Sequence, residues 1–316
     1  MFHHFHGPGH PPGQGSIDAA ELDAIIDAVG RERILPARAF LSRAITGHLR
    51  DDDLCLTFDD NLRCQFDVAL PVVRARGITA FWFVYSSVLC GAIERIEVYR
   101  RFRTSRYPDV DSFYRAFFER LAAGPDGPRV REELSGFVPA RFLPDSPFYS
   151  DADRRFRFVR DEVLGRARYE QLMDAMIVDA GLSLVPLADG LWMDAPALRS
   201  LHAEGHVVGM HSHTHPTKME YLSAAEQRRE YGTNRDLLTV LLGTPPTTVS
   251  HPCNSYSAET LRILADLGIR VGFRADVARA ATSPLELPRE DHANLLGSMR
   301  GRARSAWPQA AIPTVR

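Results

Sequence analysis

Lysine is almost absent from this sequence: Lys218 is the single lysine among 38 basic residues, which 40 acidic residues outnumber. The formal net charge is −2, so no basic field favours nucleic acid, and we expect none as a partner. No run approaches the roughly 18 apolar residues that a membrane span needs. The N-terminus also lacks the basic stretch and apolar core of a signal peptide. These absences predict a cytoplasmic protein without a membrane span.

Cysteine is scarce as well. Its four positions, Cys55, Cys64, Cys90 and Cys253, show no CxxC spacing, which indicates reduced thiols better than a disulfide framework. A chain of 316 residues buries enough surface to fold without disulfides or a structural metal. With 45% hydrophobic and 25% charged residues, the composition excludes disorder and a coiled coil.

Short apolar runs alternate with helical patterns along much of the chain. The runs predict strands near residues 54–58, 78–85, 182–185, 207–211, 247–251, 269–273 and 285–288, and a short one at 1–6. Helical spacing follows at 18–29, 66–73, 195–204, 224–242 and 258–267. Repeated strand–helix units predict an α/β fold with parallel strands, closed into a complete or partial barrel.

The alternation breaks between about residues 89 and 180, where an Arg-, Phe- and Tyr-rich segment reads as helical. We interpret it as an insertion into a single domain that spans residues 1–296. Residues 297–316 have no apolar period and predict a flexible tail. The arginines at 95–106 could meet a diphosphate, although a solvated face is the simpler interpretation. The insertion could also form the contact of a homo-oligomer.

Two adjacent carboxylates, Asp59 and Asp60, end the first strong apolar run, Leu54–Phe58. Their charges repel each other unless a cation or hydrogen bonds intervene. The carboxyl ends of parallel barrel strands are also where such folds place active sites. Alternatively, one of the two aspartates simply caps the following helix.

Three histidines follow a later apolar run, in the sequence His211-Ser212-His213-Thr214-His215. His211 and His215 are four residues apart, so both imidazoles can converge on one point if the segment turns helically. Two histidines and one carboxylate with an open position form a frequent catalytic arrangement for zinc and other divalent ions. The alternative is a polar loop whose histidines have no common role.

Together these motifs resemble the polysaccharide deacetylase family, carbohydrate esterase family 4 with the NodB-homology fold. The family motif TFDD is complete at residues 57–60, and HSxxH is met by His211, Ser212 and His215. The resemblance implies a distorted (β/α) barrel, with the helical insertion between the first and second motifs. It also implies a divalent metal, most often Zn²⁺, held by Asp60, His211 and His215. Asp59 would be the general base of the reaction.

The later family motifs are less complete. Pro252 fits the third motif, but His251 or Ser250 stands near the place of its arginine, and Cys253 replaces its tyrosine. The backbone N–H of Cys253 could still stabilise an oxyanion, because that role does not need the side chain. The final segment resembles the motif that carries the general acid, which predicts His292 in this role. Arg289 could take over from the missing arginine and orient Asp59.

The resemblance implies metal-dependent hydrolysis of an N-acyl group, acetyl or formyl, from an amino sugar. A cytoplasmic location favours a nucleotide- or lipid-linked precursor of a surface glycan as substrate.

Two alternatives to this function remain. A catalytically silent, metal-containing carbohydrate-binding protein would account for the incomplete third motif. A glycosidase with Asp59 and Asp60 as its acid/base pair would need carboxylates about 5 Å or more apart, which neighbouring residues rarely achieve.

Overall fold

The structure, a computed structural model, describes residues 1–144, 149–277 and 281–301. The chain divides into two compact units. The first combines Met1–Ala92 with Trp192–Arg316, and the second is Ile93–Leu191. The first unit contains the sheet and all the sequence motifs, and the second consists of helices that interrupt it between the second and third strands.

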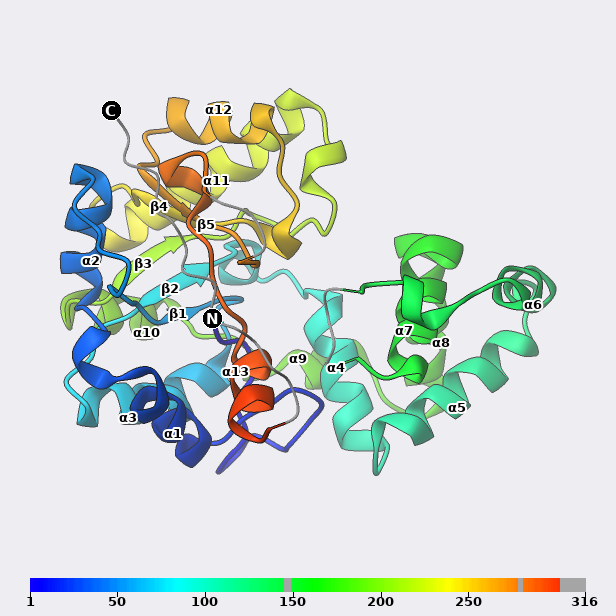
Figure 1. The fold of residues 1–316 in the computed structure, drawn as a ribbon. Helices are drawn as coiled ribbons and strands as arrows, with labels where there is room; N and C mark the ends of the chain where they lie inside the picture. The colour runs from blue at the N-terminus through cyan, green and yellow to red at the C-terminus, as the bar shows by residue number, and fades with distance from the viewer. Residues whose placement is uncertain (145–148, 278–280, 302–316) are drawn as a thin grey trace. The chain divides into compact units, whose positions relative to one another are not determined.

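Five parallel strands form the sheet of the first unit, in the spatial order of the sequence (Figure 1). They are β1 (Thr57–Phe58), β2 (Phe81–Val84), β3 (Val207–Met210), β4 (Thr248–Ser250) and β5 (Val271–Phe273). The central pair is in continuous register from Phe81 beside Val207 to Val84 beside Met210. Because every strand runs in the same direction, all carboxyl ends meet at one rim, which carries both Asp59-Asp60 and His211–His215.

The side chains of β2 alternate between the two faces of the sheet. Trp82 and Val84 belong to the large core that covers one face, whereas Phe81 and Phe83 belong to a smaller core on the other. Phe40 of helix α2 (Ala37–Thr46) lies in this smaller core with Phe273 of β5. A strand buried on both faces is a continuous apolar run, which is why the sequence pattern of this strand was easy to recognise.

The first and last described segments of this unit connect the two edges of the curled sheet, β1 and β5. Phe2 pairs with Phe58 beside β1, and Leu287 pairs with Phe273 beside β5, each as an isolated parallel bridge. The amide of His292 then donates to the carbonyl of Met1, with an N–O distance of 3.2 Å. The five strands therefore curl into a half-barrel whose open side is joined by hydrogen bonds rather than by a sixth strand.

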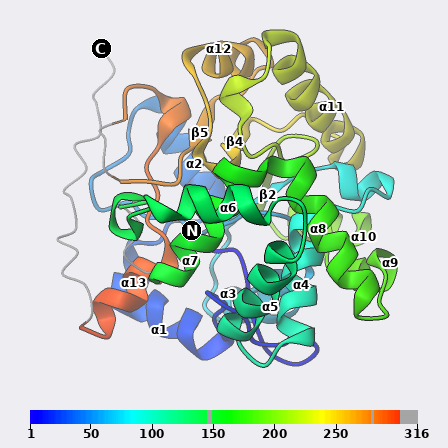
Figure 2. The ribbon, with the colours of Figure 1, turned by 90° about the vertical axis from the view of Figure 1, so that its right-hand side faces the viewer.

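Among the helices around this sheet, those at residues 19–29, 195–203, 224–242 and 258–266 begin and end within one residue of the predicted positions, whereas the helix at 292–299 was not predicted. In the first unit they are α1 (Ala19–Val29), α2, α3 (Leu70–Ala75), α10 (Ala195–Ala203), α11 (Ala224–Leu242), α12 (Ala258–Asp266) and α13 (His292–Met299). Serine or aspartate caps such as Asp18 and Ser223, each with a glutamate three residues later, fix several of these starts. Helices α11 and α12 lie side by side, as do α1 and α13 (Figures 1 and 2).

Three predicted segments have a different structure. Residues 182–185 are not a strand: they lead into helix α9 (Leu184–Ala188) of the second unit. Residues 285–288 contain a short 3₁₀ turn, Pro284–Glu286, and only the Leu287 bridge. Residues 1–6 likewise contribute isolated bridges instead of a strand. The predicted tail begins inside α13 and, from residue 302 onward, lies outside the described residues.

The second unit is built on aromatic packing. Its helices are α4 (Arg95–Arg106), α5 (Val110–Ala122), α6 (Gly127–Ser135), α7 (Asp151–Phe158), α8 (Gly165–Asp179) and α9. Phe113, Phe117 and Phe156 are fully buried, and the rings of Phe117 and Phe156 meet edge to face at 5.0 Å. This apolar centre explains the density of aromatic residues that marked the segment in the sequence.

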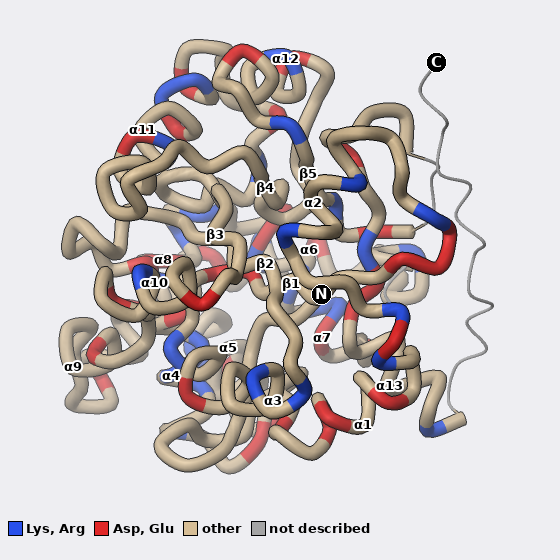
Figure 3. Tube along the Cα trace, turned by 90° about the vertical axis from the view of Figure 1, so that its left-hand side faces the viewer, with Lys and Arg blue, Asp and Glu red and all other residues tan. Residues whose placement is uncertain are grey.

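Acidic and basic positions are interspersed along the described chain (Figure 3). Some of them join helices of the first unit: Arg76 pairs with Asp23 of α1, and Arg74 pairs with Glu204 after α10. No helix among the described residues combines the length and apolarity required to cross a bilayer.

Candidate metal and catalytic centre

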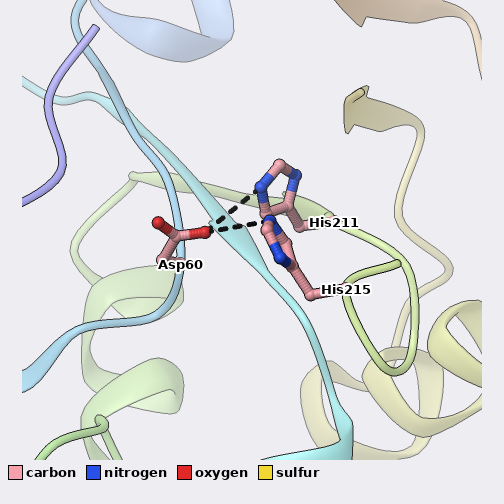
Figure 4. Close-up of side chains that lie close together, drawn as sticks. All are labelled: Asp60, His211 and His215. Atoms are coloured by element: carbon pink, nitrogen blue, oxygen red, sulfur yellow. Dashed lines mark ion pairs between the residues drawn. The ribbon is translucent and has the colours of Figure 1, made fainter. Parts of the chain in front are cut away.

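Asp60, His211 and His215 converge at the carboxyl rim of the sheet (Figure 4). Oδ1 of Asp60 lies 3.3 Å from Nε2 of His211 and 3.4 Å from Nε2 of His215. Asp60 follows β1, and both histidines follow β3. The three candidate metal ligands of the sequence are therefore in one place.

The donor set fits a divalent cation. Oδ1 of Asp60 is buried but makes no hydrogen bond to any described residue, an arrangement that costs free energy unless another group satisfies the oxygen. Nδ1 of His211 lies 2.8 Å from the carbonyl oxygen of Ser250, so it can donate its proton there and leave Nε2 free as a ligand. One carboxylate oxygen and two imidazole nitrogens are a ligand set that zinc accepts in catalytic sites.

The charges of the centre favour an ionised Asp60. Burial by itself would raise the pKa of this carboxyl, but the adjacent imidazoles of His211 and His215 outweigh burial and hold the pKa well below its usual range. The carboxylate is therefore available as an anionic ligand at neutral pH.

Asp59, the predicted base, makes a two-point ion pair with Arg289. Nη1 and Nη2 of Arg289 donate to Oδ1 and Oδ2 of Asp59, both at 2.8 Å, and both side chains are almost fully buried. The hydroxyl of Ser250 accepts from Arg289 at 2.8 Å and donates to Oδ2 of Asp59 at 2.9 Å. Burial would raise the pKa of Asp59, but the guanidinium of Arg289 outweighs it and keeps this pKa far below its ordinary value.

Strained backbone marks the same rim. Among residues other than glycine, Asp60, Ser212, His215 and Cys253 have φ values of 77°, 66°, 52° and 50°. Such left-handed conformations are disfavoured by about 1–2 kcal/mol for L-residues and collect at functional sites. The ends of β1, β3 and β4 are thus held in costly conformations where the candidate ligands lie.

Helix α11 holds the histidine loop in place. The carboxylate of Glu230 accepts from the amides of His213 and Thr214 at 3.0 and 2.8 Å. One turn further along, Oδ1 of Asn234 accepts from the amide of His211 at 3.1 Å. Two polar side chains on one helix face therefore fix the course of the loop between the two histidine ligands.

The remaining predicted site residues are Cys253 and His292, together with Ser250 and His251 of the third motif. Cys253 lies in the turn directly after β4, and its side chain is exposed. His292 is buried at the start of α13, where its ring stacks on Phe2 at 5.7 Å and its Nε2 lies 3.0 Å from the carbonyl of Gly15. Of the two residues that stand near the place of the missing arginine, Ser250 contacts Asp59, whereas His251 stacks on Tyr256 at 4.2 Å.

Arginines of the 95–106 segment make contacts within the second unit. Arg95 lies 3.4 Å from a carboxylate oxygen of Asp174, and Nη1 of Arg101 donates to the carbonyl oxygens of Leu187 and Asp189. Both guanidinium groups thus have protein partners, as a structural role would require.

Sequence reasoning placed Ser250 near the missing arginine without giving it a role, and it did not identify Glu230, Asn234 or Gln65 as parts of the centre. Nε2 of Gln65 donates to the carbonyl of Asp59 at 2.5 Å. The available signal was positional: a polar residue at the buried end of a strand or on the buried face of a helix must find a hydrogen bond. That rule selects such residues but does not name their partners.

Comparisons with known proteins agree with the motifs. Residues 186–272 match the family model of polysaccharide deacetylases, a segment that includes β3, β4 and both histidine ligands. No curated protein gives a significant match. The matched segment includes HSxxH but not TFDD, so the likeness to the family that both motifs indicate covers part of the chain.

Solved structures show the same fold at low sequence identity. The Streptococcus pyogenes deacetylase PplD, solved in complex with acetate, is 15% identical with a TM-score of 0.54, over 95% of this chain and 96% of that one. A de-N-acetylase from Aggregatibacter actinomycetemcomitans is 9% identical with a TM-score of 0.51, over 92% of each chain. The predicted distorted α/β barrel is thereby confirmed.

Proposed function

We propose that this chain belongs to the polysaccharide deacetylase family and is a metal-dependent hydrolase that removes an N-acyl group from an amino sugar. One observation carries the proposal above all. The unbonded Oδ1 of Asp60 faces two imidazole nitrogens, and the adjacent Asp59 is held ionised by Arg289. Hydrolysis uses a base beside the metal ligands, whereas a carbohydrate-binding protein without activity would use Asp59 only through its structural pair with Arg289.

Asp60, His211 and His215 would hold the ion. When bound, a divalent ion lowers the pKa of water and polarises the amide carbonyl. Asp59 would accept a proton from the attacking water. Its Oδ1 accepts one hydrogen bond, from Arg289, and keeps a lone pair, whereas Oδ2 accepts from both Arg289 and Ser250. The pair with Arg289 fixes the carboxylate so that this lone pair has a defined direction.

We assign oxyanion stabilisation to the backbone N–H of Cys253. This residue follows β4, whose Ser250 binds Asp59, and its positive φ turns the backbone immediately after that strand. A backbone donor does not depend on the side chain, so a cysteine in place of the family tyrosine is compatible with the role.

The metal, the location, the carrier of the sugar and the oligomeric state are proposed from the sequence analysis. We propose zinc as the metal, a cytoplasmic location, and an N-acetyl or N-formyl sugar carried on a nucleotide or lipid as substrate. A homo-oligomer formed through the helical unit is also proposed, and light scattering at several protein concentrations tests it.

The experiment compares metal-stripped and zinc-reloaded protein on two probes, uridine-diphosphate-linked N-acetylglucosamine and a chitin tetramer. We expect zinc-dependent release of acetate, faster from the nucleotide-linked sugar. Asp59→Asn should bind zinc normally but lose activity by at least about 10²-fold. Faster cleavage of the tetramer would contradict the proposed substrate. Zinc-loaded wild type and Asp59→Asn that bind the sugars equally and cleave neither would favour the silent carbohydrate-binding protein.

A further inference from the structure

The N-terminal segment runs alongside the end of β1 and enters the catalytic centre. The amide of Phe2 donates to the carbonyl of Thr57 at 2.9 Å, and the amide of Asp59 donates to the carbonyl of Phe2 at 3.1 Å. Nε2 of Gln65 then binds the carbonyl of His3 at 2.8 Å as well as that of Asp59. The backbone of His3 is therefore fixed to the same elements that hold the proposed base.

The imidazole of His3 points to this base. Its Nε2 lies 3.9 Å from Oδ2 of Asp59, the oxygen that Arg289 and Ser250 also contact, and 28% of the side chain is exposed. A group that is partly exposed and next to the base can reach both a bound substrate and solvent. A proton donor for the leaving group must lie within hydrogen-bond reach of the substrate, and the location of His3 beside the base is compatible with this role.

His292, which the motif predicts as the acid, lies differently. Its side chain is only 6% exposed, and its Nε2 faces the carbonyl of Gly15 at 3.0 Å while the ring stacks on Phe2. Burial also lowers the pKa of His292, which favours the neutral ring that cannot give up a proton as an acid. Its contacts are those of a residue that anchors Phe2, and with it the segment that carries His3.

We propose that His3 is a catalytic residue that protonates the leaving amine. The inference rests on the proposed deacylation. In that reaction the water oxygen forms a bond to the acyl carbon, and one water proton goes to Asp59. The imidazolium of His3 gives its proton to the nitrogen as the carbon–nitrogen bond breaks, so the products are a carboxylic acid and a free amine. His3 regains a proton from solvent, and Asp59 releases its proton to solvent.

A leaving group that needs no proton separates this role from a structural one. The test uses zinc-loaded protein with two substrates: the N-acetyl sugar that wild type cleaves faster, and 4-nitrophenyl acetate, whose phenolate leaves unprotonated. For His3→Gln we expect kcat on the amide to fall about 10²-fold or more, with less than about a threefold change on the ester. The matched control is His10→Gln, because His10 binds Asp67 at 2.9 Å instead of Asp59 and should change neither rate.

Zinc content and thermal unfolding are measured for all three proteins. Equal losses on both substrates, or an unchanged amide rate in His3→Gln, would overturn the role of His3 while leaving the deacylation intact. If the zinc-loaded wild type cleaves neither substrate, the proposed function is wrong, and the role of His3 is wrong with it.

Discussion

Arg289 and Asp59 are 230 residues apart in the chain and meet in a buried ion pair with both N–O distances at 2.8 Å. Arg289 lies on the segment that follows the Leu287 bridge at one edge of the sheet, and Asp59 follows β1 at the other. The pair therefore orients the proposed base and, at the same time, joins the two edges of the half-barrel.

Removing the guanidinium should destabilise the fold as well as the centre. Arg289→Met leaves the carboxylate of Asp59 buried without its cation, and we expect the free energy of unfolding to fall by about 3–5 kcal/mol. Arg289→Lys keeps the charge but loses the two-point geometry, so its loss should be smaller. Urea unfolding of metal-free protein measures both. Equal stabilities of Arg289→Met and wild type would contradict the structural importance of the pair.

Zinc should stabilise the wild-type fold through the three ligands. At a free zinc concentration of 100 times Kd, we expect about 2.7 kcal/mol of added stability, seen as a rise in Tm. Asp60→Asn and His215→Asn should lose most of this rise. The exposed Asp52, close in sequence to Asp60, provides the control Asp52→Asn, which should keep it. A full zinc-dependent rise in Asp60→Asn would place the ion elsewhere.

The Cys253 thiol should be dispensable. Because we assign the role to the backbone N–H, Cys253→Ala should retain activity within about threefold. Cys253→Gly relieves the positive φ of 50° and should raise the free energy of unfolding by up to about 1 kcal/mol relative to Cys253→Ala. Steady-state kinetics and urea unfolding measure these effects. Complete loss of turnover in Cys253→Ala would instead assign chemistry to the thiol.

His206 should make stability depend on pH. Nδ1 of this buried ring accepts from the amide of Ala80 at 2.9 Å and from the indole of Trp82 at 3.1 Å, which requires the neutral form. Burial lowers its pKa from 6.5 to about 4. The unfolded chain therefore binds this proton first, and stability that is complete above pH 6.5 is lost as the pH falls toward 4.

The variant His206→Asn keeps an acceptor but does not titrate. Between pH 6.5 and 4, the free energy of unfolding of wild type should fall more than that of His206→Asn, by up to about 3 kcal/mol. Urea unfolding across this range measures the difference. Parallel pH profiles for the two proteins would contradict a neutral, buried His206.

The sequence predicts the parts of this structure that depend on local pattern. Asp60 and His211 are recognisable because each follows a buried strand directly, and parallel strands bring such ends to one rim. The start of α11 is likewise indicated by Ser223 and Glu226, which form its capping box.

Contacts across the fold could not be predicted in the same way. Ser250 occupies an ordinary strand position, and its partner Asp59 is 191 residues away. Residues 182–185 are apolar enough for a strand, yet they lead into a helix of the second unit. Short apolar runs do not distinguish the two states, and tertiary packing decides between them.

A crystal of zinc-loaded protein, with anomalous diffraction recorded at the zinc edge, tests the central claim most directly. We predict one peak about 2.0–2.2 Å from a carboxylate oxygen of Asp60 and from Nε2 of both His211 and His215, with solvent at the remaining position. A peak at any other place in the chain would contradict the account, as would a fourth protein ligand that completes the coordination.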